Sequence, residues 1–237
     1  MASGGRSGPS TRGADVMSTL FLHGLGAVGE VWRGAGFSPD LPGHGSAGWD
    51  APYSFEKHAR HVLALLPDES VDVVGHSMGG VVALTLAGLV PQRVRSVVAL
   101  GVKVAWTPEE LDFAQALPQR PPKVFASRAE AAERFLKVSG LAGLVPAEDA
   151  VVDAGIVDRG DGWSLAQDPR TFGVGAFDMR ALVGDAGCPV VLARGEHDGM
   201  VTHAQLADLQ DDAVSLAALG HNAHVEDLGA ILALIPR

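Results

Sequence analysis

The fold of this chain is decided by the stretch Val71-Asp72-Val73-Val74-Gly75-His76-Ser77-Met78-Gly79-Gly80. An apolar, β-branched run opens it, and the following residues 81–90 are rich in Ala, Val and Leu. This order predicts a buried strand, a tight turn that carries a serine, and then a helix. Small residues at Gly75 and Gly79 let the chain reverse there without clashes of Cβ atoms. We therefore predict that Ser77 is a catalytic nucleophile.

The composition limits the class of protein. A length of 237 residues fits one α/β domain or two small ones. The formal net charge of −10 argues against nonspecific binding to nucleic acid or an anionic membrane, because both need basic patches. A single cysteine, Cys188, allows no disulfide within the chain. Apolar runs fall short of the roughly 18 residues of a membrane helix. We expect a cytoplasmic protein with no nucleic-acid or membrane partner.

Three regions differ in character along the chain. Residues 1–16 are rich in Gly, Ser, Arg and Pro without periodicity, and they lack the apolar core of a signal peptide. We predict that they form a disordered tail. Residues 17–102 and 180–237 alternate between strand and helix patterns. Residues 103–179 carry helical patterns without a core strand, so we predict a helical lid inserted into an α/β core.

Two backbone N–H groups are expected beside Ser77. A short strand at residues 18–22 runs into His23-Gly24-Leu25-Gly26, and this turn brings free N–H groups to the carboxyl end of a sheet. The N–H of Leu25 and the N–H of Met78, directly after the serine, are predicted to form an oxyanion hole. His23 is expected to pack under the turn and bond to the backbone.

Several other polar residues are assigned to scaffolding. Asp40 and His44 lie among prolines and glycines, which favours a role in holding a loop. His58 and His61 lie three apart in the helix predicted at residues 54–66, and no third ligand for a metal is evident. We expect these two histidines on a solvated face, with no metal and no cofactor.

The predicted lid supplies the apolar side chains that we expect to form the wall of a substrate pocket. The lid residues in this set are Trp106, Phe113, Phe135 and Phe177. Met200, just after a later strand, completes the predicted wall.

Two later strand ends carry the partners of the serine. The strand pattern at residues 188–193 ends in Arg194-Gly195-Glu196-His197-Asp198, and that at 213–219 ends in Gly220-His221. A serine hydroxyl needs an imidazole to take its proton, which His221 can do because an unperturbed histidine titrates near pH 6.5. Asp198 would hold the tautomer and stabilise the imidazolium. His224 competes for the role of base, but it lies one helical turn further on.

The sequence resembles the α/β-hydrolase fold family over nearly its whole length after Met17. The likeness rests on these motifs: His23-Gly24-Leu25-Gly26, Asp40-Leu41-Pro42-Gly43-His44-Gly45, Gly75-His76-Ser77-Met78-Gly79-Gly80, Gly195-Glu196-His197-Asp198 and Gly220-His221. The chain order serine, acid, histidine is typical of that family. The resemblance implies a mostly parallel central sheet of about six strands, helices on both faces and a helical cap. It also implies Ser77 as nucleophile, Asp198 as acid and His221 as base.

The resemblance narrows the reaction. A serine in the turn between the strand and the helix disfavours the dehalogenases and epoxide hydrolases of this fold, which use aspartate at that position. The motifs look like those of small bacterial carboxylesterases and cofactor-free perhydrolases, so we expect a small, largely apolar ester to be cleaved through an acyl-serine. A carbon–carbon bond hydrolase, a lactonase and a thioesterase are alternatives with the same triad. A non-catalytic hormone-receptor-like member is the remaining alternative, which the complete triad disfavours.

Only the predicted tail precedes residue 18, so we expect the sheet to lack the first strands usual in the family and one of its edges to be exposed or covered by a partner. Homodimerisation through that edge is a hypothesis.

Overall fold

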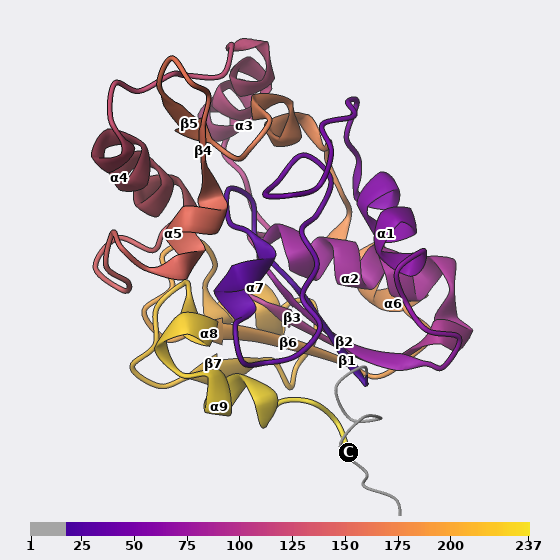
Figure 1. Ribbon diagram of the computed structural model, residues 1–237. Coiled ribbons are helices and arrows are strands. Elements are labelled where there is room, and N and C mark those ends of the chain that lie inside the picture. The colour runs from indigo at the N-terminus through magenta and orange to yellow at the C-terminus, as the bar shows by residue number, and fades with distance from the viewer. Residues whose placement is uncertain (1–17) are drawn as a thin grey trace, which may run out of the picture.

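The computed structural model describes residues 18–237, so the predicted tail at 1–16 lies outside the described residues. Its centre is a sheet of five parallel strands in the order β1-β2-β3-β6-β7 (Figure 1). The strands are β1 (Thr19–Leu22), β2 (Val71–His76), β3 (Val94–Leu100), β6 (Val190–Gly195) and β7 (Val214–Leu216). Because all five are parallel, their carboxyl ends meet at one edge, where ligands of such sheets bind.

The predicted count of about six strands is one too high for the described residues. Beside β1, Phe37 makes only an isolated parallel bridge to Leu20 and does not form a sixth strand. One hydrogen bond of 2.9 Å, from the Phe21 N–H to the Phe37 carbonyl, accompanies it. The proline at position 39 cannot donate to a ladder, which is in keeping with so short a pairing. Dimerisation through a sheet edge stays a prediction, which size-exclusion chromatography tests.

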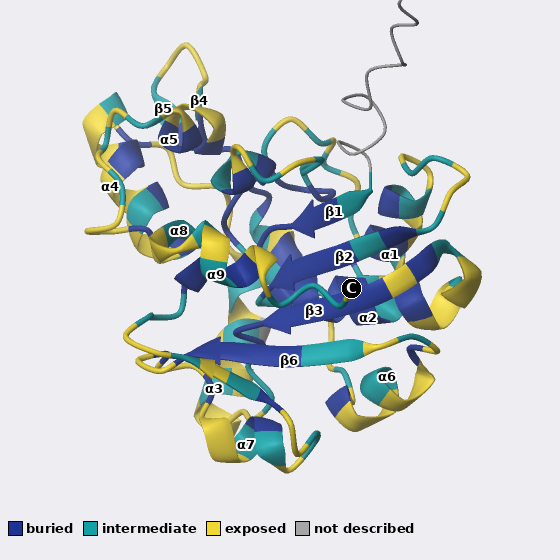
Figure 2. Cartoon of the chain, turned by 90° about the horizontal axis from the view of Figure 1, so that it is seen from below, coloured by how far each residue is buried: buried dark blue, intermediate teal, exposed yellow. Residues whose placement is uncertain are grey.

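Helices pack on both faces of the sheet (Figure 2). Alternate strand residues point to opposite faces, so Val73 packs with α1, α2 and α6 while Val74 packs with Trp32, α8 and α9. The helices outside the segment 103–179 are α1 (Phe55–Leu63), α2 (Met78–Leu89), α6 (Met179–Asp185), α7 (His203–Ala207), α8 (Ala223–Glu226) and α9 (Leu228–Leu232), with 3-10 turns η2 (Gly29–Trp32) and η3 (Pro91–Arg93). No helix within residues 18–237 is long and apolar enough to cross a membrane.

Residues 103–179, which we call the inserted segment, join β3 to α6 (Figure 1). The elements in it are α3 (Pro108–Ala116), η4 (Leu117–Gln119), α4 (Arg128–Ser139), α5 (Ala150–Gly155), β4 (Ile156–Asp158), β5 (Trp163–Leu165) and η5 (Pro169–Gly173). Helix α5 ends at Gly155, because Ile156 leaves it to pair antiparallel with Leu165. Most apolar side chains buried by the segment form a cluster with Val28 from outside it, separate from the two clusters that flank the sheet.

Side-chain caps define where these helices begin and end. Thr107 accepts from the Glu110 N–H, and the Glu110 carboxylate accepts from the Thr107 N–H, which is a capping box before α3. Ser127 caps α4 in the same position. Gly140 ends α4 with φ of 72°, a conformation that glycine adopts without strain.

Candidate active site

The turn between β2 and α2 has the geometry that its sequence predicts. Ser77 has φ of 52°, which is rare for a residue with a side chain, and its N–H donates to the Leu100 carbonyl at 2.8 Å. A Cβ added to Gly75 would lie 2.2 Å from the Gly79 carbonyl oxygen. One added to Gly79 would lie 2.4 Å from the Leu22 carbonyl oxygen. The two glycines therefore permit a backbone approach that a methyl group would block.

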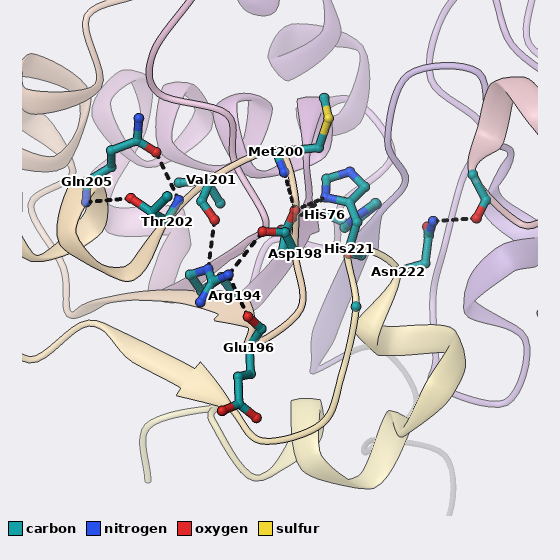
Figure 3. Close-up of polar contacts among 12 residues, drawn as sticks. His76, Arg194, Glu196, Asp198, Met200, Val201, Thr202, Gln205, His221 and Asn222 are labelled. Carbon is teal, nitrogen blue, oxygen red and sulfur yellow. Dashed lines mark hydrogen bonds and ion pairs between the residues drawn. The ribbon is translucent and has the colours of Figure 1, made fainter.

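Asp198 and His221 lie in contact, from the loops after β6 and β7 (Figure 3). His221 Nδ1 is 3.0 Å from Asp198 Oδ2 and 3.1 Å from Oδ1. The carboxylate is buried, and its Oδ1 also accepts from the Met200 N–H at 2.7 Å. Because an ionised carboxylate only accepts, this pair puts the imidazole proton on Nδ1 and leaves Nε2 able to take a proton.

Gly101 links the serine turn to this pair. It directly follows Leu100, the acceptor for Ser77, and it has φ of 63°. A Cβ added here would lie 3.2 Å from Asp198 Oδ2 and 3.3 Å from His221 Nδ1. The end of β3 thus contacts all three predicted residues, so the structure brings Ser77, Asp198 and His221 to one edge of the sheet.

The two histidines nearest His221 are neutral and buried. His76 Nε2 donates to the His221 carbonyl at 2.9 Å, and burial lowers the pKa of His76 well below its usual value. His224 stacks between His76 and Trp32, with ring centroids 4.4 Å and 4.3 Å away. Burial lowers the pKa of His224 to about 3, and neither of its ring nitrogens has a hydrogen-bond partner in the described residues. His221, with Asp198 as partner, is therefore better placed to be the base than His224.

The predicted oxyanion donors lie at the ends of β1 and β2. Met78 is the first residue of α2, so its N–H has no partner inside the helix. Leu25 lies inside the turn closed by the bond from the Ala27 N–H to the Gly24 carbonyl, at 3.1 Å. Within residues 18–237, neither N–H has a hydrogen-bond acceptor. Both are thus available to a developing negative charge.

His23 and His44 contact the backbone of the turn that carries the Leu25 N–H, and this is the role expected for His23. Its Nδ1 donates to the Gly24 carbonyl and its Nε2 accepts from the Leu41 N–H, both at 2.9 Å. His44 Nε2 lies 3.4 Å from the Gly26 nitrogen. Burial lowers the pKa of both histidines, so they stay neutral acceptors.

Asp40 has the scaffolding role that the sequence favours. Its Oδ1 accepts from the Gly29 N–H at 2.7 Å, and its Oδ2 accepts from the N–H and the hydroxyl of Ser46, both at 2.8 Å. The carboxylate thereby holds two stretches of the loop together, at a distance from the Asp198–His221 pair that leaves it without contact to either residue.

The prediction for His58 is wrong. Its side chain is fully buried instead of solvated, stacked on Tyr53 with the rings nearly parallel, and neither ring nitrogen has a partner in the described residues. Burial lowers the pKa of His58 to about 4. The spacing to His61 suggests a solvated face, but His58 is next to Ala59 and four residues before Val62, and these three residues form the buried side of α1. No group of three or more His, Cys, Asp or Glu in residues 18–237 could hold a metal ion.

The predicted pocket residues differ in their exposure. Phe135 is only 2% exposed and packs against Gly155 inside the inserted segment, so it belongs to the core of that segment and is not open to a substrate. Phe177 packs edge-on against Phe55. Trp106, Phe113 and Met200 are 44%, 58% and 44% exposed, so their side chains are free to contact a ligand.

Sequence reasoning missed residues that act through the backbone. Asn222, directly after His221, donates to the Gly140 carbonyl at 3.0 Å and so joins the histidine loop to the end of α4 (Figure 3). No sequence signal pairs two residues so far apart. The Met200 N–H that binds Asp198 and the contacts of Arg194 with the same loop likewise depend on tertiary structure.

Comparison with known proteins fits this geometry. The family model described as alpha/beta hydrolase fold matches residues 20–142, about half of the chain. This chain belongs to the alpha/beta hydrolase fold family. The matched part of this hydrolase includes the turns at His23 and Ser77, which carry the predicted oxyanion donors and nucleophile.

Curated relatives support the same family. A pimeloyl-[acyl-carrier protein] methyl ester esterase of Edwardsiella ictaluri is 37% identical over 106 residues, which cover 41% of this chain and 41% of that protein. An esterase of Mycobacterium tuberculosis is 27% identical over 94% of this chain and 83% of its own. The part of this chain that matches the first curated relatives spans about two fifths of the length of each of them.

The solved structure of a thioesterase domain from the curacin biosynthetic pathway superposes with a TM-score of 0.73. It covers 91% of this chain and 89% of that one at 18% identity, a likeness that shows the fold alone.

Proposed function

We propose that this hydrolase-fold chain is a serine esterase. It cleaves a carboxylic ester of a small, largely apolar substrate through an acyl-serine intermediate. The observation that carries the proposal is the contact of 3.0 Å between His221 Nδ1 and the buried Asp198 carboxylate, at the sheet edge where Ser77 stands on a strained turn. Relatives named as esterases support it.

Each residue has a role in the proposed reaction. Ser77 Oγ attacks the ester carbonyl while His221 Nε2 takes its proton. The Asp198 carboxylate accepts a hydrogen bond from the Nδ1–H and stabilises the imidazolium that forms. The N–H groups of Leu25 and Met78 bind the negative oxygen, and each such donor is worth about 3 kcal/mol in the transition state. His221 then gives its proton to the leaving alcohol, and water repeats the sequence on the acyl-serine.

The histidine cluster around His221 suits this cycle. His221 must become positive in the transition state, and a second positive ring in contact with it would oppose that charge. The His76 ring lies 4.6 Å from that of His221, and His224 packs behind His76. Burial keeps the pKa values of His76 and His224 low, so both stay neutral and neither opposes this charge.

The test is turnover of short p-nitrophenyl esters together with labelling by a fluorophosphonate, which captures an activated serine. We expect both with the unaltered chain, and neither with Ser77→Ala. Esters of acetate, butyrate and octanoate, a thioester, a lactone and a vinylogous diketone then decide between the esterase and the other acyl and carbon–carbon chemistries. Absence of both turnover and labelling in a folded protein would contradict the proposal.

A cytoplasmic location is part of the proposal. It is supported by the single cysteine and by the lack of a membrane-crossing helix among residues 18–237. Fractionation of cells that produce the natural protein, followed by detection with the fluorophosphonate, tests it.

A further inference from the structure

A buried arginine lies beneath the loop that carries Asp198. Arg194 is near the end of β6, and only 7% of its surface is exposed. Its Nε donates to the Val201 carbonyl at 2.7 Å, and its Nη2 donates to the carbonyls of Glu196 and Asp198 at 2.9 Å and 3.0 Å. Figure 3 shows the guanidinium inside the curve of the loop formed by residues 196–201.

This arrangement costs folding free energy. No carboxylate in the part of the chain that the structure describes lies within 4 Å of the guanidinium. Burying a charge without an ionic partner costs several kcal/mol, and an apolar side chain would fill the space without that cost. The contacts of Arg194 therefore point to a task beyond packing.

The contacts show which task it is. Three of the four acceptors of Arg194 are backbone carbonyls before, at and after Asp198; the fourth is the Ser215 hydroxyl on β7, at 3.3 Å. The guanidinium is planar and rigid, so donors on two of its nitrogens fix three points of the loop in one geometry. The same loop presents the Met200 N–H that holds Asp198 Oδ1.

We propose that Arg194 is a positioning residue of the triad, which holds the loop 196–201 so that the Asp198 carboxylate faces His221. This inference rests on the proposed esterase function. Arg194 acts through geometry, because its planar guanidinium donates to several carbonyls at once, which a single point charge cannot do.

The test compares Arg194→Met and Arg194→Lys with the unaltered protein. We expect kcat for p-nitrophenyl butyrate to fall roughly 100-fold in both, with KM changed less than threefold, because small misplacements of a catalytic group cost about that much. Proton NMR is the second readout. We expect a low-field resonance of the His221 Nδ1 proton in the unaltered protein, and we expect it to be lost or broadened in both variants. Lysine keeps the charge, so it reports on a folded protein if the methionine variant does not fold.

Ser215→Ala is the matched control, since it removes an acceptor of Arg194 that is not on the acid loop. We expect its kcat within twofold of the unaltered protein and the resonance retained. Full activity and resonance in Arg194→Lys, or in a folded Arg194→Met, would overturn the proposal. Because the resonance needs no turnover, it decides the role of Arg194 even if the esters tested are not substrates.

Discussion

The sheet edge and the inserted segment are built in opposite ways. At the edge, Ser77, Asp198 and His221 come from the ends of three parallel strands, and backbone hydrogen bonds set their places. The segment buries its own apolar cluster, and it leaves Trp106 and Phe113 exposed. This difference suggests a division of labour: the edge performs the bond chemistry and the segment selects the substrate. Substitutions in the two regions should then change different kinetic constants.

The largest effect is expected at the histidine. His221→Ala removes the base and should lower kcat by about 10⁴-fold or more, with KM changed little. His224→Phe, which keeps the stack between Trp32 and His76, should retain at least a tenth of the activity. Initial rates on p-nitrophenyl butyrate measure both. The reverse order of activities in the two variants would assign the role of base to His224 instead of His221.

The next largest effect is expected at the turn that carries Ser77, where Gly79 lies close to the backbone at the end of β1. A methyl group at position 79 would meet the carbonyl oxygens of Leu22 and His23, at 2.4 Å and 2.7 Å, and neither can move aside as a side chain could. Gly79→Ala should lower the free energy of unfolding by about 3 kcal/mol, measured by urea denaturation.

Gly184 is the matched control for that substitution. It lies in α6, away from the edge, and nothing is within 4 Å of an added Cβ. Gly184→Ala should stabilise the protein by about 0.5–1 kcal/mol, because alanine is the better helix former. Equal effects of the two substitutions would show that the turn relaxes around a side chain.

The same contrast explains what the sequence could predict. Local patterns predict the turn that carries Ser77, the turn that carries Leu25, and the two later strand ends. They suffice because a strand end and a glycine turn fix where a side chain points. The segment offers no such rule. Phe135 and Phe113 both lie in helices of the predicted lid, yet Phe135 is buried and Phe113 is exposed. Which of them faces a partner depends on tertiary packing. The prediction for His58 fails for another reason, because its spacing to the apolar Val62 places it on the buried face of α1.

Between pH 6.5 and 4, buried histidines should lower the stability of the protein, and all nine histidines lie outside residues 103–179. The pKa of His58 is about 4 in the folded state against 6.5 for an unperturbed histidine. The unfolded chain therefore binds more protons between these values, so stability is lost as pH falls from 6.5 to 4, by about 3 kcal/mol for this group. In His58→Phe the midpoint of thermal unfolding should fall less over that range.

His61→Gln is the control for the acid effect, since His61 lies on the same helix and is not fully buried. Its stability should follow pH as in the unaltered protein. If His58→Phe shows the same loss on acidification as the unaltered protein, burial of His58 does not contribute to it.

The smallest effect is expected in the segment, and it tests the division of labour most directly. Replacing Trp106 and Phe113 together by alanine removes two half-exposed apolar surfaces, which recover only part of their burial free energy when a substrate covers them. KM for p-nitrophenyl octanoate should rise roughly 3- to 10-fold, since a tenfold change corresponds to about 1.4 kcal/mol. KM for the acetate ester and kcat for both should change less than twofold if, as we propose, these side chains contact only the longer acyl chain. Leu65→Ala, which removes a 42% exposed side chain from the body, should alter neither constant. A fall in kcat with both esters would instead mean that the segment helps to align the triad, and the contrast between the two regions would be lost.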